Sequence, residues 1–220
     1  MRVLAIDTTT ANGSVALAEG EEVQGEVRFR VTDSHSAHVL PAAEFLLRTL
    51  DLSPAAVDGY AVTTGPGSFT GLRVGIATVQ GLALGAGRPC VGVPALDVLA
   101  ARIVGTAETL VAMVDAYRDE VYAAIYERDG RIRGERAVLP PEGVLAQLPE
   151  AAAFIGDGAA RYRERIVAAR PQSLFPCRSL FLAGTLARVG GARLAAGEGT
   201  SPDALRPLYL RGADIRRPAG

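Results

Sequence analysis

The chain has 220 residues, of which 23 are basic and 24 acidic, so its formal net charge at neutral pH is −1. Every basic residue is arginine, and the lack of lysine excludes both Schiff-base chemistry at an amine and a P-loop of the Walker type. With 49% hydrophobic and 21% charged residues, the composition is that of an ordinary folded protein of one or two domains.

The sequence carries no signal for a membrane or for an oxidising compartment. Met1–Asp7 reaches an acidic residue after a short apolar run, which does not fit a signal peptide. No apolar run approaches the roughly 20 residues that a membrane-spanning helix needs. Cys90 and Cys177 are too few for a disulfide framework and are not spaced like zinc ligands. We therefore expect a cytoplasmic protein that does not associate with membranes.

The first half of the chain begins with three expected strands and continues with alternating helices and strands. The first apolar run ends in Asp7 and is followed by a polar turn, and two further apolar runs come next. The expected strands cover residues 3–6, 14–18, 22–31, 59–64 and 90–93, and the expected helices cover residues 36–50 and 70–86.

The second half repeats this order. Its first apolar run ends in Asp115, and Asp129-Gly130 predicts a hairpin turn between the next two strands. The expected strands cover residues 110–114, 120–126, 131–138 and 152–155, and the expected helices cover residues 142–148, 159–169 and 180–194.

Three strands followed by alternating helices and strands predict a mixed sheet with helices on both faces. Two such units in tandem are the pattern of the ribonuclease-H-like double domain of actin, Hsp70 and sugar kinases. We therefore expect this α/β fold, with an N-terminal domain at residues 1–105 and a C-terminal domain at residues 106–220. The charge divides unevenly, with −5 in residues 1–115 and +4 in residues 116–220. The simpler interpretation is that the second half has an arginine-rich surface in contact with solvent, and the alternative is that it meets nucleic acid or an acidic partner.

Residues 74–86 contain no charged side chain. A helix at the surface of a soluble protein normally presents a polar face to water, so we expect this one to be covered on both sides. Gly71 and Gly75 form one pair spaced by four, and Gly81 and Gly85 form another. Because an interior helical glycine costs about 1 kcal/mol relative to alanine, we expect another backbone to approach closely. The second cover is either the other half of the chain or another subunit.

Asp7 and Asp115 end equivalent strands of the two repeats and could hold a hydrated Mg²⁺ beside nucleotide phosphates. Thr8 follows the first of them, and Gly156 and Gly158 could border the adenosine of a bound nucleotide. An ATP-dependent phosphotransferase is therefore one hypothesis, although no residue stands out as the base for an acceptor.

His35 and His38 are the only histidines, and a spacing of three would place both on one face of a helix, where a metal site is conceivable. The zincin motif instead needs a spacing of four with a Glu between, and no third ligand is obvious beyond Asp33. Ser34 or Ser36 as a helix cap, with the histidines in the first turn, is the simpler interpretation. A metallopeptidase is the weaker alternative.

Five segments carry a resemblance to a known family: Leu4–Thr8, His35-Ser36 with Leu40-Pro41, residues 65–75 with their helix, Asp115–Tyr122 and Pro207–Arg211. Together they resemble the TsaB family, also called YeaZ, of bacterial proteins that take part in making threonylcarbamoyladenosine in tRNA. The block Gly-Pro-Gly-Ser-Phe-Thr-Gly-x-Arg at residues 65–73 is the most specific of these segments.

The resemblance implies a paralogue of the catalytic subunit TsaD that has lost the active site and needs no cofactor. In the family, TsaB docks TsaD through N-terminal-domain helices, and the ATPase TsaE joins them. The complex transfers a threonylcarbamoyl group to N6 of adenosine 37 in tRNAs that read codons starting with A.

The resemblance also implies that the free protein associates with itself through the same surface. We expect it to meet tRNA through the complex, and the sequence leaves open whether the arginine-rich second half also contacts tRNA directly. The residues that we expect in this interface are Leu40, Ala43, Leu47, Leu72, Gly75, Ile76, Val79, Leu82 and Ala83.

Overall fold

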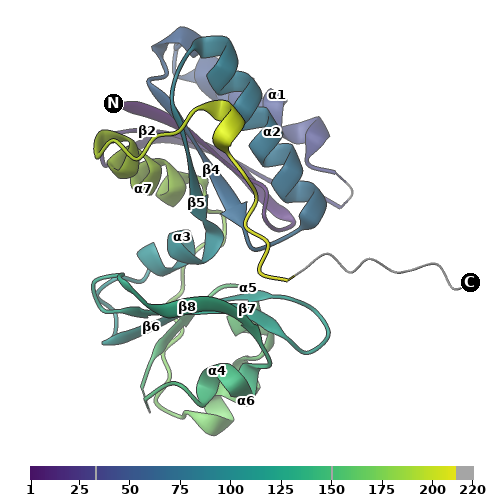
Figure 1. Ribbon diagram of the computed structural model, residues 1–220, viewed down its shortest axis with the longest axis vertical. Coiled ribbons are helices and arrows are strands. Elements are labelled where there is room, and N and C mark those ends of the chain that lie inside the picture. Colours follow the sequence, from purple (N-terminus) through teal and green to yellow (C-terminus); the bar gives the residue numbers. More distant parts are fainter. Residues whose placement is uncertain (33, 150, 212–220) are drawn as a thin grey trace, which may run out of the picture.

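The computed structural model describes residues 1–211 except residues 33 and 150, and these form two β-sheets with helices around them (Figure 1). The strands are β1 (Arg2–Asp7), β2 (Asn12–Glu19), β3 (Glu22–Arg30), β4 (Gly59–Gly65), β5 (Cys90–Pro94), β6 (Thr109–Asp115), β7 (Val121–Glu127), β8 (Ile132–Leu139) and β9 (Ala153–Ile155). The helices are α1 (Ser36–Thr49), α2 (Phe69–Ala86), α3 (Ala95–Ala101), α4 (Pro141–Leu145), α5 (Asp157–Arg161), α6 (Arg163–Ala169) and α7 (Ala183–Ala195), with short 3-10 turns η1 (Pro54–Ala56) and η2 (Pro202–Ala204). Within these ranges, no helix has the length and hydropathy to cross a membrane.

Both sheets follow the same plan. The first has the strand order β3-β2-β1-β4-β5, and the second has the order β8-β7-β6-β9. In each sheet the central strand, β1 or β6, pairs antiparallel with the strand after it and parallel with a strand that follows a helix. The expected repeat of a mixed sheet in an α/β fold is therefore confirmed.

The first sheet is covered by helices on both faces, and this explains the continuous apolar run in β1. Successive side chains of a strand point to opposite faces. Leu4 and Ile6 accordingly pack in one hydrophobic cluster with α1 and α2, whereas Val3 and Ala5 pack in a second cluster with α7. Figure 1 shows α7 on the opposite side of this sheet from α1 and α2.

The division of the chain into domains at residues 1–105 and 106–220 stays a prediction. Helix α7, which lies in the second of these ranges, packs against β1, β2 and β4 of the first sheet. The backbone N–H of Ala183 donates to Ser14 Oγ at 3.1 Å, which fixes the start of α7 on β2. The segment after α7 also stays with the first sheet, since the N–H of Leu208 donates to the carbonyl of Thr64 at 2.7 Å. Helix α7 and the segment up to Leu208 thus pack with the first sheet.

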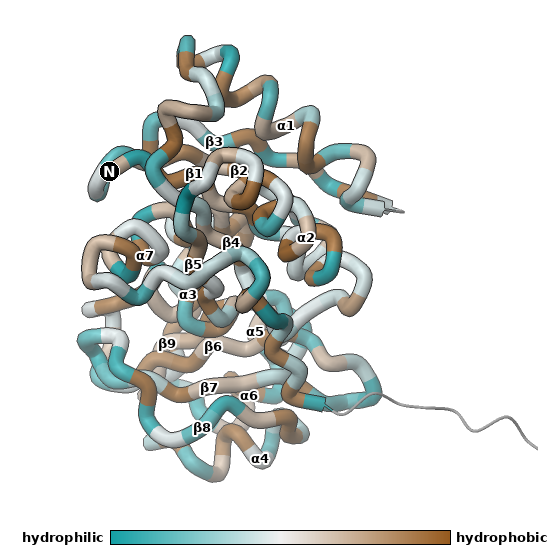
Figure 2. Tube along the Cα trace, turned by 45° about the horizontal axis from the view of Figure 1, so that its top comes forward, coloured by the Kyte–Doolittle hydropathy of each residue, from teal (hydrophilic) through white to brown (hydrophobic). Residues whose placement is uncertain are grey.

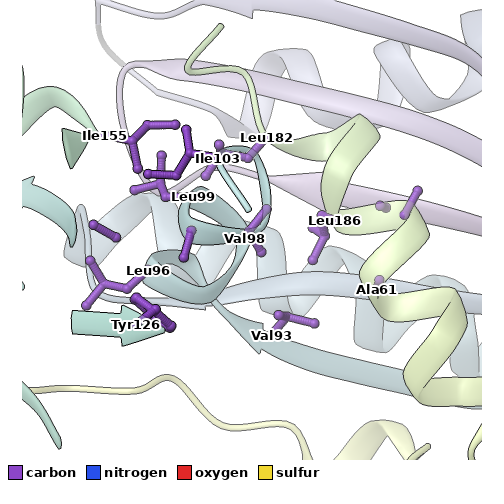
Figure 3. Close-up of a cluster of buried hydrophobic side chains, with 14 of the residues drawn as sticks. Ala61, Val93, Leu96, Val98, Leu99, Ile103, Tyr126, Ile155, Leu182 and Leu186 are labelled. Atoms are coloured by element: carbon purple, nitrogen blue, oxygen red, sulfur yellow. The ribbon is translucent and has the colours of Figure 1, made fainter. Parts of the chain in front are cut away.

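The two sheets share one continuous hydrophobic core (Figure 3). Leu96 and Leu99 of α3, and Ile103 just after it, are buried between them. Tyr126 of β7 reaches this cluster from the second sheet, and Leu186 of α7 reaches it from the first. The two repeats are therefore joined by packed side chains.

A polar network at the edge of the shared core adds to this connection. Asp97 of α3 accepts hydrogen bonds from the Tyr126 hydroxyl at 2.8 Å and from Arg136 Nη2 of β8 at 2.7 Å. Arg193 Nη2 of α7 also donates to Asp97, at 3.3 Å. Burial, with the charge of Asp97 adding to it, raises the pKa of Tyr126 far above its ordinary value, so this hydroxyl stays protonated and remains a donor.

We expect Asp97→Ala to lower the free energy of unfolding by about 2 kcal/mol, because it leaves the buried Tyr126 hydroxyl without an acceptor and also removes the charge partner of two arginines. Both arginines reach water, with exposed side-chain fractions of 26% for Arg136 and 32% for Arg193, which limits the loss. Tyr126→Phe should cost about 1 kcal/mol. Urea unfolding measures both changes.

The control is Arg128→Ala, which breaks an exposed pair with Glu108 and should change stability by less than about 0.5 kcal/mol. A cost for Asp97→Ala no larger than that of the control would show that the network does not join the two sheets.

Candidate functional site

Asp7, at the end of β1, is fully buried. One of its carboxylate oxygens, Oδ1, accepts hydrogen bonds from the backbone N–H of Thr9 at 3.2 Å, the Thr9 hydroxyl at 2.8 Å and the Thr63 hydroxyl at 2.7 Å. The other oxygen, Oδ2, is buried without a partner among the described residues. Burial raises the pKa of Asp7 above its ordinary value, and the hydrogen bonds from Thr63 and Thr9 oppose this shift.

The turn after Asp7 is covered by the start of α2. The N–H of Ser68 donates to the carbonyl of Thr9 at 2.7 Å, and the Thr8 hydroxyl donates to the carbonyl of Gly71 at 2.8 Å. A Cβ atom at Gly71 would lie 2.1 Å from the carbonyl oxygen of Thr8, and one at Gly75 would lie 2.4 Å from its hydroxyl. Gly71 and Gly75 therefore permit a close approach within the chain, and this approach seals Asp7 from the surface.

Asp115, at the equivalent end of β6, is also committed to contacts within the chain. Its Oδ1 accepts from the N–H of Tyr117 at 3.1 Å, and its Oδ2 pairs with Arg161 Nη1 at 2.9 Å. Asp115 lines an interdomain cleft of about 660 Å³ together with Thr9 and Tyr117, but Asp7 does not reach this cleft. The two carboxylates thus do not face a common space, as a shared Mg²⁺ would require.

The turn that begins α5 packs directly against β6. A Cβ atom at Gly156 would lie 2.0 Å from the carbonyl oxygen of Met113, and one at Gly158 would lie 2.9 Å from the carbonyl carbon of Val114. Asp157, between them, lines the cleft. The two glycines therefore serve the packing of α5 on the sheet, and the structure does not place them on the cleft wall where an adenosine would lie.

The two histidines do not gather with further metal ligands. His35 Nε2 lies 2.8 Å from the carbonyl oxygen of Thr10, and the His38 ring stacks on Phe29 with a centroid distance of 5.7 Å. Asp33 lies outside the described residues. Within the part of the chain that the structure describes, no three His, Cys, Asp or Glu side chains lie close enough to hold a metal ion.

Helices α1 and α2 lie next to each other on one side of the first sheet (Figures 1 and 2), with hydrophobic segments recurring along α2 (Figure 2). The expected interface stays a prediction, but five of its nine residues do not reach the surface of this helix pair. They are buried in the chain's own core: Leu72, Gly75, Ile76, Val79 and Ala83.

The remaining four do border the open surface. Leu40 is 53% exposed, and Leu82 is half-buried. Ala43 and Leu47 are nearly buried but line the floor of an open groove of about 800 Å³ between α1, η1 and α2. A second groove, of about 650 Å³, shares Leu82 with the first and continues along α2 past Gly85.

The open side of α2 is built from residues that the expectation left out of the interface. Leu84 is 75% exposed, and Ala77, Gly81 and Gly85 are exposed as well. A Cβ atom at Gly81 or Gly85 would meet nothing within 4 Å. We call these four residues, with Leu40 and Leu82, the α1–α2 face.

Polar groups line the two grooves beside this face. Glu44, Arg48 and Asp51 line the first groove, and Arg88 lines the second. An apolar centre with a polar rim is the usual composition of a protein–protein interface. The α1–α2 face is therefore the best candidate for the functional site.

Comparisons with known proteins identify both fold and family. A family model described as "TsaD: tRNA N6-adenosine threonylcarbamoyltransferase" matches residues 23–187. The "tRNA threonylcarbamoyladenosine biosynthesis protein TsaB" of Escherichia coli is 40% identical over 156 residues, which cover 68% of this chain and 67% of that relative. The solved structure of YeaZ from Pseudomonas aeruginosa matches 95% of this chain and 99% of its own, with 35% identity and a TM-score of 0.81.

A more distant match shows the fold alone. The ROK hexokinase from Thermus thermophilus is 14% identical and has a TM-score of 0.52, with 84% of this chain and 97% of that chain covered. The protein is thus of the ribonuclease-H-like double-domain class that includes sugar kinases. Within this class, the chain belongs to the TsaB (YeaZ) family, as its motifs predicted.

The environment of Asp7 predicts a pH dependence of stability. An unfolded Asp ionises near its ordinary pKa of 3.8, whereas the folded chain holds the Asp7 proton to higher pH. The folded state therefore binds more protons in this window, so stability falls as pH rises from about 4 through the folded pKa, and it stays lower at neutral pH. Asp7→Asn keeps the Oδ1 acceptor and cannot ionise, so we expect it to gain stability relative to the original chain between pH 4 and pH 7.5.

Urea unfolding of both proteins at the two pH values measures this difference. Asp58→Asn, which changes a half-buried carboxyl at the start of β4, is the control for the loss of one charge. If the stability difference between Asp7→Asn and the original chain is the same at pH 4 and pH 7.5, then Asp7 is not held protonated by the fold.

Proposed function

We propose that this chain is a non-catalytic subunit in the synthesis of threonylcarbamoyladenosine in tRNA. Its family membership supports the pathway, because its relatives in Escherichia coli and Haemophilus influenzae are named as biosynthesis proteins of this nucleoside. The sealed position of Asp7 supports the absence of catalysis, because a metal ion could reach its carboxylate only after the start of α2 moved away from the Thr8–Thr9 turn.

The exposed glycines of α2 are the observation that carries the docking proposal. Gly71 and Gly75 are explained by the turn that packs on them, but Gly81 and Gly85 have no neighbour within the described chain that requires a glycine. Each interior helical glycine costs about 1 kcal/mol relative to alanine. The close approach of another protein's backbone would explain why these two positions are glycine.

The hydrophobic side chains of the α1–α2 face supply the driving force for such a contact. Leu84 and Leu40 are more than half exposed, and no charged side chain lies on α2 beyond Arg73. Covering one large apolar side chain contributes about 1.5 to 3 kcal/mol. The grooves beside Leu82 offer room for side chains of a partner helix.

The occupant that we propose is a TsaD-like catalytic subunit. The TsaD family model matches residues 23–187, a range that contains α1 and α2, so a TsaD-like chain has an equivalent helix pair. Two related faces can then pack helix against helix across the apolar centre. A second copy of this chain offers the same face, so the free protein forms a homodimer. A TsaE-like ATPase then joins the pair with TsaD.

Gly81→Ala separates docking from folding. The added methyl meets nothing within the chain, so we expect it to raise the stability of the monomer by up to about 1 kcal/mol. The same methyl should weaken association with a TsaD-like subunit about tenfold or more, because it holds the two backbones apart. Thermal unfolding and isothermal titration calorimetry measure the two effects.

Gly191→Ala in α7 is the matched control, since its added methyl makes only an ordinary contact, 3.5 Å from Val3. It should change stability in the same direction and leave association unchanged. Leu84→Glu on the α1–α2 face should abolish the complex. Ala192→Glu, at an exposed position of α7, should not. Wild-type affinity of both Gly81→Ala and Leu84→Glu would place the interface elsewhere.

A further inference from the structure

Four arginines from different parts of the chain lie close enough for their charges to interact. They come from β3, the end of α3, the segment before α7, and α7 itself. We call these residues the arginine cluster: Arg28, Arg102, Arg178 and Arg188. Arg102 Nη1 donates to the Thr185 hydroxyl of α7 at 2.8 Å. Arg178 Nε donates to the carbonyl of Arg102 at 3.4 Å. These contacts hold guanidinium groups from distant parts of the chain at one surface.

The positive charge of the cluster is largely unbalanced. Glu26 is the carboxylate that acts on Arg102, and it is already engaged by Arg28, at 2.7 Å from Nε, and by the backbone N–H of Gly184 at 3.1 Å. Among the residues that the structure describes, Arg102, Arg178 and Arg188 form no ion pair. Four guanidiniums against one carboxylate leave three positive charges.

The arginines of the cluster repel one another, so the fold holds their positive charges together against an unfavourable electrostatic energy. Burial lowers the pKa of Arg102, Glu26 opposes the shift, and the charges of Arg28, Arg188 and Arg178 add to it. The Nε of Arg102 is also buried without an acceptor in the described chain. An anion that docks on the cluster would relieve the repulsion between these groups.

A phosphate backbone fits these groups. Guanidiniums present paired donors that match phosphate oxygens, and a chain of phosphates can engage several arginines at once. The ring of Phe181 lies beside the cluster, 5.4 Å from the Arg28 guanidinium, and gives it an apolar floor. Exposure of Arg28 and Arg178 leaves the surface open to a large ligand.

We propose that the arginine cluster binds the phosphate backbone of tRNA directly. This inference rests on the proposed role in tRNA modification and adds a contact made by this subunit itself. The cluster lies with α7, on the opposite side of the first sheet from the α1–α2 face, so one molecule can hold tRNA and a protein partner at the same time.

The test is a titration of the isolated chain with an unmodified tRNA transcript, followed by fluorescence anisotropy at several salt concentrations. Arg178→Ala with Arg188→Ala should weaken binding roughly tenfold and reduce the slope of log affinity against log salt by roughly one to two. Arg102 stays in place, because it is half-buried and bonded to α7.

The matched control is Arg131→Ala with Arg133→Ala, which removes the same charge from exposed ion pairs with Asp129 and Glu127. It should change the tRNA affinity less than twofold. Thermal unfolding confirms that both double variants remain folded.

Three outcomes would overturn the proposal: no tRNA binding by the original chain at low salt, an equal loss in the control, or an unchanged tRNA affinity of the cluster variant. If that variant instead loses its TsaD-like partner, then the cluster binds an acidic protein surface. Gly81→Ala should keep full tRNA affinity, so failure of the docking proposal and failure of this one are told apart.

Discussion

The contact between the start of α2 and the Thr8–Thr9 turn is the constraint on which the other features depend. Two hydrogen bonds, and the close approach of Gly71 and Gly75 to Thr8, hold the helix against the end of β1. This contact closes the space in which Asp7 would otherwise meet a ligand. It also fixes the rotation of α2 about its axis, because Gly71 and Gly75 must face inward. Gly81 and Gly85 are then left on the outer side, so the same packing buries Asp7 and exposes one uncharged side of α2.

The second constraint is that each repeat supplies a helix that packs against the sheet of the other repeat. Helix α3 packs against the second sheet, and α7 returns to cover the first, so the hydrophobic core runs through both. The Asp97 network extends this joint to the edge of the core. The same return of the chain brings Arg178 and Arg188 next to Arg28 and Arg102, and so creates a positive surface that neither repeat has alone.

Sequence patterns predicted the order of nearly all strands and helices, because buried strands read as short apolar runs and the turns between them carry Gly and Asp. They also predicted close approaches at the glycines of α2, and within the described chain Gly71 and Gly75 make such approaches. They could not predict which residues of α2 face outward. A helix without charged residues has no polar side from which its orientation on the sheet can be predicted. The expected interface therefore includes Ile76 and Val79, which are buried in the chain's own core.

The amino-acid sequence by itself determined the α/β repeat, the family and the uncharged helix, since these depend on local hydropathy and on short motifs. Only the tertiary structure decided that Asp7 is sealed, that α7 belongs to the first sheet and that four distant arginines share one surface. Each of these depends on contacts between residues far apart in the chain. Local periodicity carries no information on such contacts, and so it cannot predict that α7 packs on the first sheet.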